Sequence, residues 1–153
     1  MHWRQPDMKY ICDGHRQWLM DNPSELQAGW LRATSMGCEA MAGRQWQRAT
    51  VCFGNAVEIA ELELSKNPDK KAQQHYLDAA AQMMAAFRRL GDQRSCRFLF
   101  SRVLELLEQL SMRDFCEESL GILKEFTFGD SRDAEKSMWQ KLASTKERRA
   151  SLH

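Results

Sequence analysis

The chain has few of the residues that end helices or build strands. Only 3 of its 153 residues are proline and 8 are glycine, and runs of β-branched residues are almost absent. Alanine, leucine, glutamate, glutamine, arginine and methionine are abundant instead, and long stretches rich in these residues favour helices. We therefore predict an all-α fold. The length is that of one domain, with a core large enough to need no metal or disulfide.

Long apolar runs and a strong net charge are also missing. No stretch approaches the roughly 18 apolar residues needed to span a bilayer, and the first ten residues lack the apolar core of a signal peptide. The formal charge is +1, from 22 basic and 21 acidic side chains, so no overall field would hold a nucleic acid or an anionic membrane. We expect a cytoplasmic protein with no membrane partner, and we do not expect nucleic-acid binding.

The cysteines and histidines suggest no metal site. The five cysteines are odd in number and form no CxxC motif, so we expect small core residues in a reducing compartment. They are Cys12, Cys38, Cys52, Cys96 and Cys116. Cys12 and His15 have a ligand-like spacing, but a tetrahedral zinc site needs two more ligands, and none lies nearby in the sequence. We expect neither a metal nor a cofactor.

No catalytic constellation is evident either. Glu117 and Glu118 are adjacent on a predicted helix and point in different directions, which indicates a solvated face and not a general acid and base. No glycine-rich oxyanion or phosphate loop accompanies any cysteine. The Arg148–Ser151 segment matches a basophilic kinase pattern, but patterns this short occur by chance. We expect a protein that is not an enzyme.

Apolar residues recur at three- and four-residue spacing in seven segments, which predicts seven helices. The expected ranges are 7–20, 24–42, 45–65, 69–90, a fifth helix from the Gly91–Asp92 turn to 110, then 113–126 and 131–143. Ser24 and Asp69 are expected to act as N-caps. Gly43 is expected to adopt the left-handed conformation after the second helix. The polar and basic residues at the end of the chain are expected to fray.

The stretch from 36 to 61 contains two helical patterns separated by a turn glycine, which predicts an antiparallel helical hairpin. Gly37, Trp46, Ala49, Phe53 and Ala56 resemble, in order and spacing, the signature of the tetratricopeptide repeat family. The resemblance implies a short right-handed α-solenoid of about seven helices. It predicts a single helical-repeat domain over 1–145, with a capping helix in 1–23, hairpin units at 24–67, 69–111 and 113–143, and a basic tail at 146–153.

The resemblance also implies a groove along the first helix of each hairpin, where a peptide or helix of another protein binds. The positions expected on this face are Leu31, Thr34, Cys38 and Met41 of the second helix and Asp78, Ala81, Ala85, Arg88 and Arg89 of the fourth. Arg88 and Arg89 could pair with carboxylate groups of a partner. Alternatively, they are solvated arginines that interact favourably with the helix macrodipole.

Aromatic residues are concentrated in the first thirty residues, although they make up only 9% of the chain. The four in question are Trp3, Tyr10, Trp18 and Trp30. They are either part of an N-terminal cap that packs on the first hairpin, or an aromatic surface that holds a partner or a second copy of the chain.

Three hypotheses for function follow. The leading one is a non-enzymatic adaptor, scaffold or chaperone-like module that binds a peptide or helix of another protein, similar to the helical-repeat chaperones of bacterial secretion systems. The second is a regulatory domain in transcription or signalling that acts through protein contacts or a helix-turn-helix. Against direct DNA binding, Arg94, Arg97 and Arg102 share their helix with bulky apolar residues. The third is an enzyme whose site is assembled from distant residues.

Overall fold

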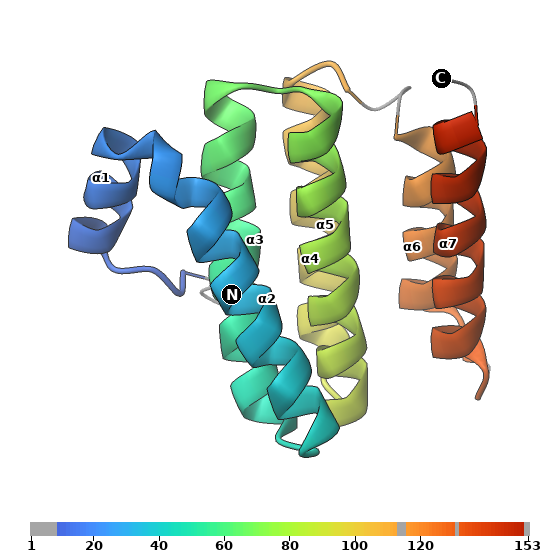
Figure 1. Cartoon of the computed structure of the whole chain (residues 1–153). Helices are drawn as coiled ribbons and strands as arrows, with labels where there is room; N and C mark the ends of the chain where they lie inside the picture. Colours follow the sequence, from blue (N-terminus) through green and yellow to red (C-terminus); the bar gives the residue numbers. More distant parts are fainter. Residues whose placement is uncertain (1–8, 113–115, 131, 152–153) are drawn as a thin grey trace, which may run out of the picture. The chain divides into compact units, whose positions relative to one another are not determined.

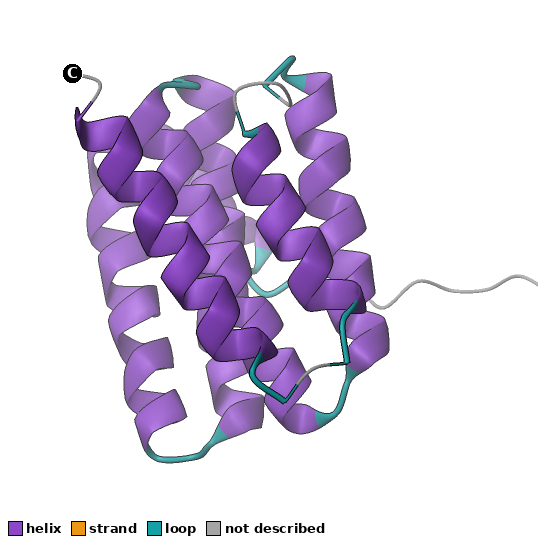
Figure 2. Cartoon of the chain, turned by 90° about the vertical axis from the view of Figure 1, so that its right-hand side faces the viewer, coloured by secondary structure: helices purple, strands orange, loops and turns teal. Residues whose placement is uncertain are grey.

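The computed structural model describes residues 9–112, 116–130 and 132–151, and the regular structure in this part of the chain is entirely helical (Figure 2). The elements are α1 (Asp13–Asp21), a 3-10 turn η1 (Pro23–Glu25), α2 (Leu26–Ala42), α3 (Trp46–Lys66), α4 (Lys70–Leu90), α5 (Gln93–Gln109), α6 (Glu117–Phe128) and α7 (Ala134–Ser151). The all-α prediction is confirmed. Among the residues described, none of the helices has the length and apolar character needed to cross a membrane.

The chain divides into two compact units, Met1–Ser95 and Cys96–His153. The first contains α1 to α4, and the second contains α6, α7 and most of α5. The sequence predicted one domain over 1–145 and a hairpin unit over 69–111. The boundary between the two units lies inside that hairpin, within the first turn of α5, where no proline, glycine or low-complexity linker marks it.

In the first unit, α3 packs against α2 on one side and α4 on another (Figure 1). Short turns connect the three helices, so each runs antiparallel to the one before it. Ala49, Ala56 and Ala60 of α3 have no exposed surface, and small side chains like these let helix backbones approach closely. A Cβ atom on Gly37 of α2 would lie 2.3 Å from Cε1 of Phe53. Gly37 and Phe53 of the signature therefore meet across the α2–α3 hairpin.

Two of the predicted turn and cap residues are confirmed and two are wrong. Gly91 is left-handed, with a φ of 76°, and Asp69 Oδ1 accepts a hydrogen bond from the Ala72 amide at 2.8 Å. After α2, however, Gly43 has a φ of −84° and Arg44 takes the left-handed conformation, with a φ of 57°. Ser24 lies inside η1 because Pro23 begins a 3-10 turn there, and α2 starts at Leu26 without a side-chain cap.

The first helix begins later than predicted, because residues 9–12 are not helical. The backbone amides of Tyr10 and Ile11 donate to the carboxylate of Glu58 on α3, and such long-range bonds compete with helix formation. Cys12 is the N-cap of α1, and its Sγ accepts from the His15 amide at 3.5 Å. The expected helical start at residue 7 lies outside the described residues.

In the second unit, α6 and α7 lie side by side (Figure 1). Leu123 and Phe126 of α6 and Met138 of α7 are buried. Residues 146–151 were expected to fray, but α7 continues to Ser151. Thr145 is only 2% exposed, and the Arg148 guanidinium pairs with Glu118 of α6. The buried Thr145 and the Arg148–Glu118 pair extend the packing of α7 beyond Leu142, the last buried apolar residue described in this helix.

Candidate functional site

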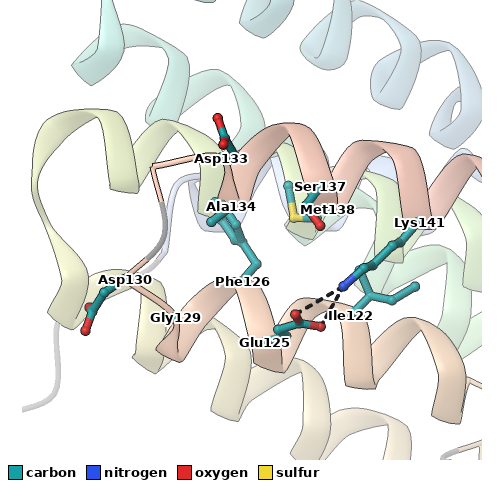
Figure 3. Close-up of a pocket in the computed structure, with 10 residues that line it drawn as sticks. All are labelled: Ile122, Glu125, Phe126, Gly129, Asp130, Asp133, Ala134, Ser137, Met138 and Lys141. Carbon is teal, nitrogen blue, oxygen red and sulfur yellow. Dashed lines mark hydrogen bonds and ion pairs between the residues drawn. The ribbon is translucent and has the colours of Figure 1, made fainter.

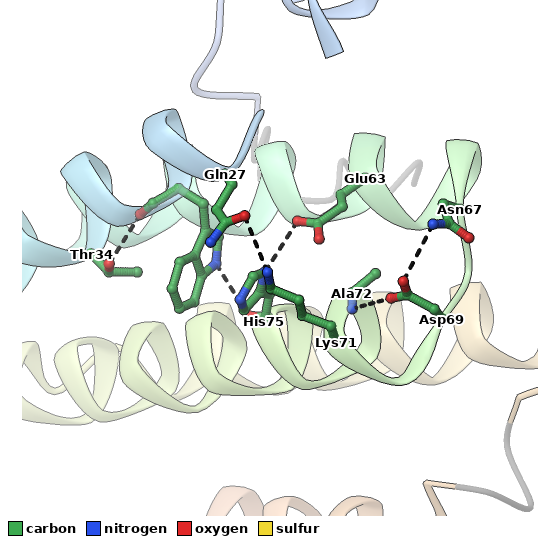
Figure 4. Close-up of polar contacts among 9 residues, drawn as sticks. Gln27, Thr34, Glu63, Asn67, Asp69, Lys71, Ala72 and His75 are labelled. Atoms are coloured by element: carbon green, nitrogen blue, oxygen red, sulfur yellow. Dashed lines mark hydrogen bonds and ion pairs between the residues drawn. The ribbon is translucent and has the colours of Figure 1, made fainter. Parts of the chain in front are cut away.

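The helices α2 and α4 lie side by side and run parallel in a fixed register (Figure 4). Lys71 Nζ donates to Gln27 Oε1 at 3.1 Å, and Trp30 Nε1 donates to the His75 carbonyl oxygen at 3.2 Å. Further along, Gln82 Nε2 lies 3.9 Å from Cys38 Sγ. The partners are 44 or 45 residues apart in each case. A constant offset over several turns requires two parallel helices.

A three-layer contact fixes this register. The imidazole of His75 on α4 stacks on the indole of Trp30 on α2, with ring centroids 4.1 Å apart and an interplanar angle of 21°. Its Nδ1 lies 3.2 Å from Glu63 Oε2 on α3 (Figure 4). The side chains of His75 and Glu63 are 14% and 18% exposed. These residues join α2, α3 and α4 at one level of the unit.

The predicted groove residues fall into exposed and buried groups. Leu31 is 50% exposed, Cys38 is exposed, and Met41 and Asp78 are partly exposed. The 44-residue offset places Thr34 level with Asp78 and Met41 level with Ala85. Thr34 is 8% exposed, and its hydroxyl donates to backbone oxygens of its own helix. Ala81 and Ala85 have no exposed surface, so neither presents atoms to a partner.

The two arginines predicted at the groove edge lie in the last turn of α4. The Arg89 guanidinium lies over the ring of Trp46, 5.3 Å from its centroid. Such cation–π contacts stabilise by about 0.5–1 kcal/mol at exposed sites. Arg89 therefore packs on the start of α3, and Arg88 beside it is partly exposed. A charge reversal at Arg89 would disturb this packing as well as any partner contact.

The three N-terminal aromatic residues that the structure describes do not form one surface. Trp30 is 9% exposed, and its ring stacks on His75 of α4. Tyr10 packs against Gly54 of α3. Trp18 is 48% exposed, and its ring centroid is 6.2 Å from that of His15. Trp3 lies outside the described residues. Tyr10 and Trp30 thus fit the cap interpretation, and Trp18 presents an aromatic ring to solvent.

Sequence reasoning missed a buried carboxylate on α3. Glu58 is 2% exposed, and its two oxygens accept from the Tyr10 amide at 2.5 Å and the Ile11 amide at 2.9 Å. One turn earlier, a Cβ atom on Gly54 would lie 2.4 Å from Cδ2 of Tyr10. The sequence did contain a signal for this site. A glycine and a glutamate stand four residues apart on α3, at positions of the helix that are otherwise apolar.

A pocket of about 310 Å³ opens between α6 and α7 of the second unit (Figure 3). Phe126, Ala134 and Met138 supply apolar lining, and Lys141 Nζ lies 3.0 Å from Glu125 Oε2. Asp130 and Asp133 also line it. Both partners of the ion pair are about half exposed or more, so the pair contributes little to stability. Among the described residues that line it, there is neither a histidine nor a cysteine.

The cysteines fall into two classes. All five are free thiols; Cys52, Cys96 and Cys116 are buried, whereas Cys12 and Cys38 are exposed. The expectation of core cysteines is therefore confirmed for three and wrong for two. Within the described ranges, no three histidine, cysteine or carboxylate side chains are grouped as metal ligands.

No family model, curated protein or solved structure matches this chain. The resemblance to tetratricopeptide repeats consequently rests on the signature residues between 36 and 60, and the repeat family stays a prediction.

Proposed function

We propose that the chain is a non-enzymatic protein interaction module that binds a peptide or helix of a partner protein across the α2–α4 face. The observation that carries the proposal is the exposure of Leu31. This large apolar side chain of α2 is half exposed, on the face that α2 forms with the parallel helix α4. We define the α2–α4 face by its outward residues: Gln27, Leu31, Cys38, Lys71, Gln74, Asp78 and Gln82.

The chemistry of the face suits a peptide. Side-chain amides both donate and accept hydrogen bonds, so Gln27 and Gln74 can pair with the amide and carbonyl groups of a peptide backbone. Lys71 and Asp78 contribute one charge of each sign, which gives the face no strong preference for a polyanion.

The rigidity of the face also supports binding. The stacked Trp30 and His75 rings and the Glu63 contact hold α2 and α4 before any partner arrives. A preorganised surface loses less conformational entropy on binding, and the difference appears as affinity. The face would bind a partner without rearranging its helices.

Among the versions of this proposal, the α2–α4 face favours an adaptor over a chaperone. A chaperone for hydrophobic segments needs a broad apolar surface, and Leu31 is the one large apolar side chain among the seven residues that define the face. We place the module in the cytoplasm, and the five free cysteines support a reducing compartment.

The test compares two substitutions on the same helix. Leu31→Arg changes the centre of the face, whereas Met36→Arg changes a residue of similar exposure, 46% against 50%. Met36 lies about 140° further around α2, off the face. Partners captured from a lysate of the source cells by the wild-type chain are identified and purified, and their Kd values are measured with each variant.

We expect Leu31→Arg to weaken binding at least tenfold and Met36→Arg to leave the Kd unchanged, with equal helicity by circular dichroism. Equal losses in the two variants, or no loss from Leu31→Arg, would place the partner elsewhere on the chain.

A further inference from the structure

We propose that the partner segment at the α2–α4 face is an amphipathic helix, with one acidic and one basic residue seven positions apart and an aliphatic residue between them. This assignment rests on the function proposed above, because it names the class of partner for the same face. Three features of the face support it: the order of the charges along α4, the position of Leu31, and the spacing of the three groups.

Two opposite charges lie along the outward side of α4. Lys71 is exposed at the start of this helix, and Asp78 is partly exposed two turns later. Lys71 Nζ donates to Gln27 Oε1 at 3.1 Å (Figure 4). Asp78 Oδ1 accepts from Gln74 Nε2 at 3.0 Å. Side-chain amides are uncharged, so these two contacts orient the ammonium and carboxylate groups without neutralising them.

The apolar group of the face lies between the two charges. The 44-residue offset between the helices places Leu31 of α2 level with His75, one turn after Lys71 and one turn before Asp78. The Leu31 side chain is half exposed, and an aliphatic partner side chain that covers it removes apolar surface of both residues from water. The groups along the face are thus basic, apolar and acidic, in that order.

The spacing of these groups matches a helix better than an extended segment. Leu31 and Asp78 lie about 6 Å and about 10.5 Å beyond Lys71 along the helix axis, from a rise of about 1.5 Å per residue. A partner helix has the same rise, so its positions i, i+4 and i+7, which share one face, reach all three groups. In a partner helix of the opposite direction, the positions are i, i+3 and i+7, which also share a face.

An extended partner would not present its side chains in this way. Its rise is about 3.3 Å per residue, so about three residues would separate the one beside Lys71 from the one beside Asp78. Successive side chains of an extended segment point to opposite sides. The residue beside Asp78 would therefore point away from the face whenever the residue beside Lys71 points toward it.

The two charges restrict the choice of partner helix. A helix with one acidic and one basic residue can pair with both Lys71 and Asp78, whereas a helix with two like charges is repelled by one of them. Exposed ion pairs contribute little each. The aliphatic contact with Leu31 therefore supplies most of the binding free energy, and the charges select among the helices that make this contact.

Stapled peptides test the assignment. Each has about 15 residues and a hydrocarbon staple on its outer side, because isolated helices of this length are marginal in water. The mixed peptide carries a central leucine, a glutamate four positions before it and a lysine three positions after it. Two further peptides carry either two lysines or two glutamates at these positions. We expect the wild-type chain to bind the mixed peptide at least fivefold more tightly than either of the others, with Kd values measured by fluorescence anisotropy.

A substitution in the chain should reverse this preference. Lys71→Glu gives the face two acidic groups, so the peptide with two lysines is expected to bind at least fivefold more tightly than the mixed peptide. An acidic residue in the first turn of a helix interacts favourably with the macrodipole, and circular dichroism checks that the variant is folded. The matched control is Lys70→Glu, which changes the charge of an exposed neighbour about 100° around α4. It should keep the wild-type preference.

A fourth peptide tests the requirement for a helix. It has the residues of the mixed peptide at the three contact positions, no staple, and prolines at two positions between them, which prevent helix formation. We expect it to bind at least tenfold more weakly than the mixed peptide. Equal binding of the two would show that the partner is not a helix and would overturn the assignment.

The charge assignment fails if the three stapled peptides bind equally, if none of them binds, or if Lys71→Glu keeps the wild-type preference. The proposed function is judged separately, by the effect of Leu31→Arg on the captured partners. Partners that lose affinity in Leu31→Arg, together with peptides that show no charge preference, would leave the function standing and overturn only the class of partner. No effect of Leu31→Arg on either would overturn both.

Discussion

At the scale of single residues, Gln82 has a buried amide oxygen that lowers the stability of the fold. Its Nε2 makes one weak contact with Cys38 Sγ, and Oε1 accepts no hydrogen bond within the part of the chain that the structure describes. A buried acceptor without a donor destabilises a fold by about 1–3 kcal/mol. We expect Gln82→Met, which keeps the length of the side chain, to raise the free energy of unfolding by about 1 kcal/mol. Urea denaturation measures this change in the free energy of unfolding.

Gln74 provides the matched control for this substitution. It lies on the same face of α4, and its Nε2 donates to Asp78 Oδ1 at 3.0 Å. Gln74→Met removes a satisfied amide and should lower the free energy of unfolding by about 0.5–1 kcal/mol. If both substitutions lower stability equally, the Gln82 amide oxygen finds a hydrogen-bond donor in solution.

The sequence predicted part of the α2–α4 face and missed the rest for identifiable reasons. Leu31 and Cys38 were placed by the repeat signature and are exposed where a partner can reach them. Ala81 and Ala85 were placed in the same way but are buried, because small side chains permit close packing as readily as they line a groove. Gln27, Gln74 and Lys71 carry no motif, so their position became evident only from the register of α2 and α4.

At the scale of elements, two helical glycines should respond in opposite directions to the same substitution. Alanine favours helix over glycine by about 1 kcal/mol, and nothing lies within 4 Å of a Cβ atom at Gly121 of α6. At Gly37 of α2 the same atom would lie 2.3 Å from the Phe53 ring. That ring is 1% exposed and has little room to move.

We therefore expect Gly121→Ala to raise the free energy of unfolding by about 0.5–1 kcal/mol and Gly37→Ala to lower it by about 1–3 kcal/mol. Thermal and urea denaturation of the two variants beside the wild-type chain provide the comparison. A stabilising Gly37→Ala would mean that α2 and α3 are further apart than the contact between Gly37 and Phe53 indicates.

Helix existence was predictable from the apolar pattern, whereas helix ends depended on contacts that a local pattern does not contain. Residues 9–12 leave the helix because Tyr10 and Ile11 donate to Glu58, some 47 positions away. Residues 146–151 stay helical although they were expected to fray. There, the Arg148 pair with Glu118 and the buried Thr145 extend the packing of α7. Both departures have long-range causes.

At the scale of the whole molecule, the division into two units was not visible in the sequence. Domain boundaries are usually found in flexible linkers, but this one falls at Ser95–Cys96, inside the first turn of a continuous helix. Gln93, Arg94 and Ser95 at the start of α5 are residue types found in ordinary helices, and none of them marks a boundary in the sequence. The apolar pattern of the sequence predicts that this segment is helical. Only the contacts between helices show which of the two units each part of α5 belongs to.

The two units should differ in stability, because smaller units bury a smaller fraction of their surface. The first unit is the longer of the two, and α3 within it has buried residues on several sides, including Phe53, Ile59 and Leu62. In the second unit, α6 is shorter and has few buried residues. Segments with less burial open at lower free energy and exchange their amide hydrogens sooner.

We expect amides between Phe53 and Leu62 of α3 to exchange at least tenfold more slowly than those between Leu120 and Phe126 of α6, a difference of about 1.4 kcal/mol. Hydrogen–deuterium exchange read by NMR or by mass spectrometry of peptides measures both segments in one sample. Added urea should remove the protection of α6 first. If both segments lose protection together at every urea concentration, the chain unfolds as one cooperative unit, and the boundary at Ser95 has no thermodynamic meaning.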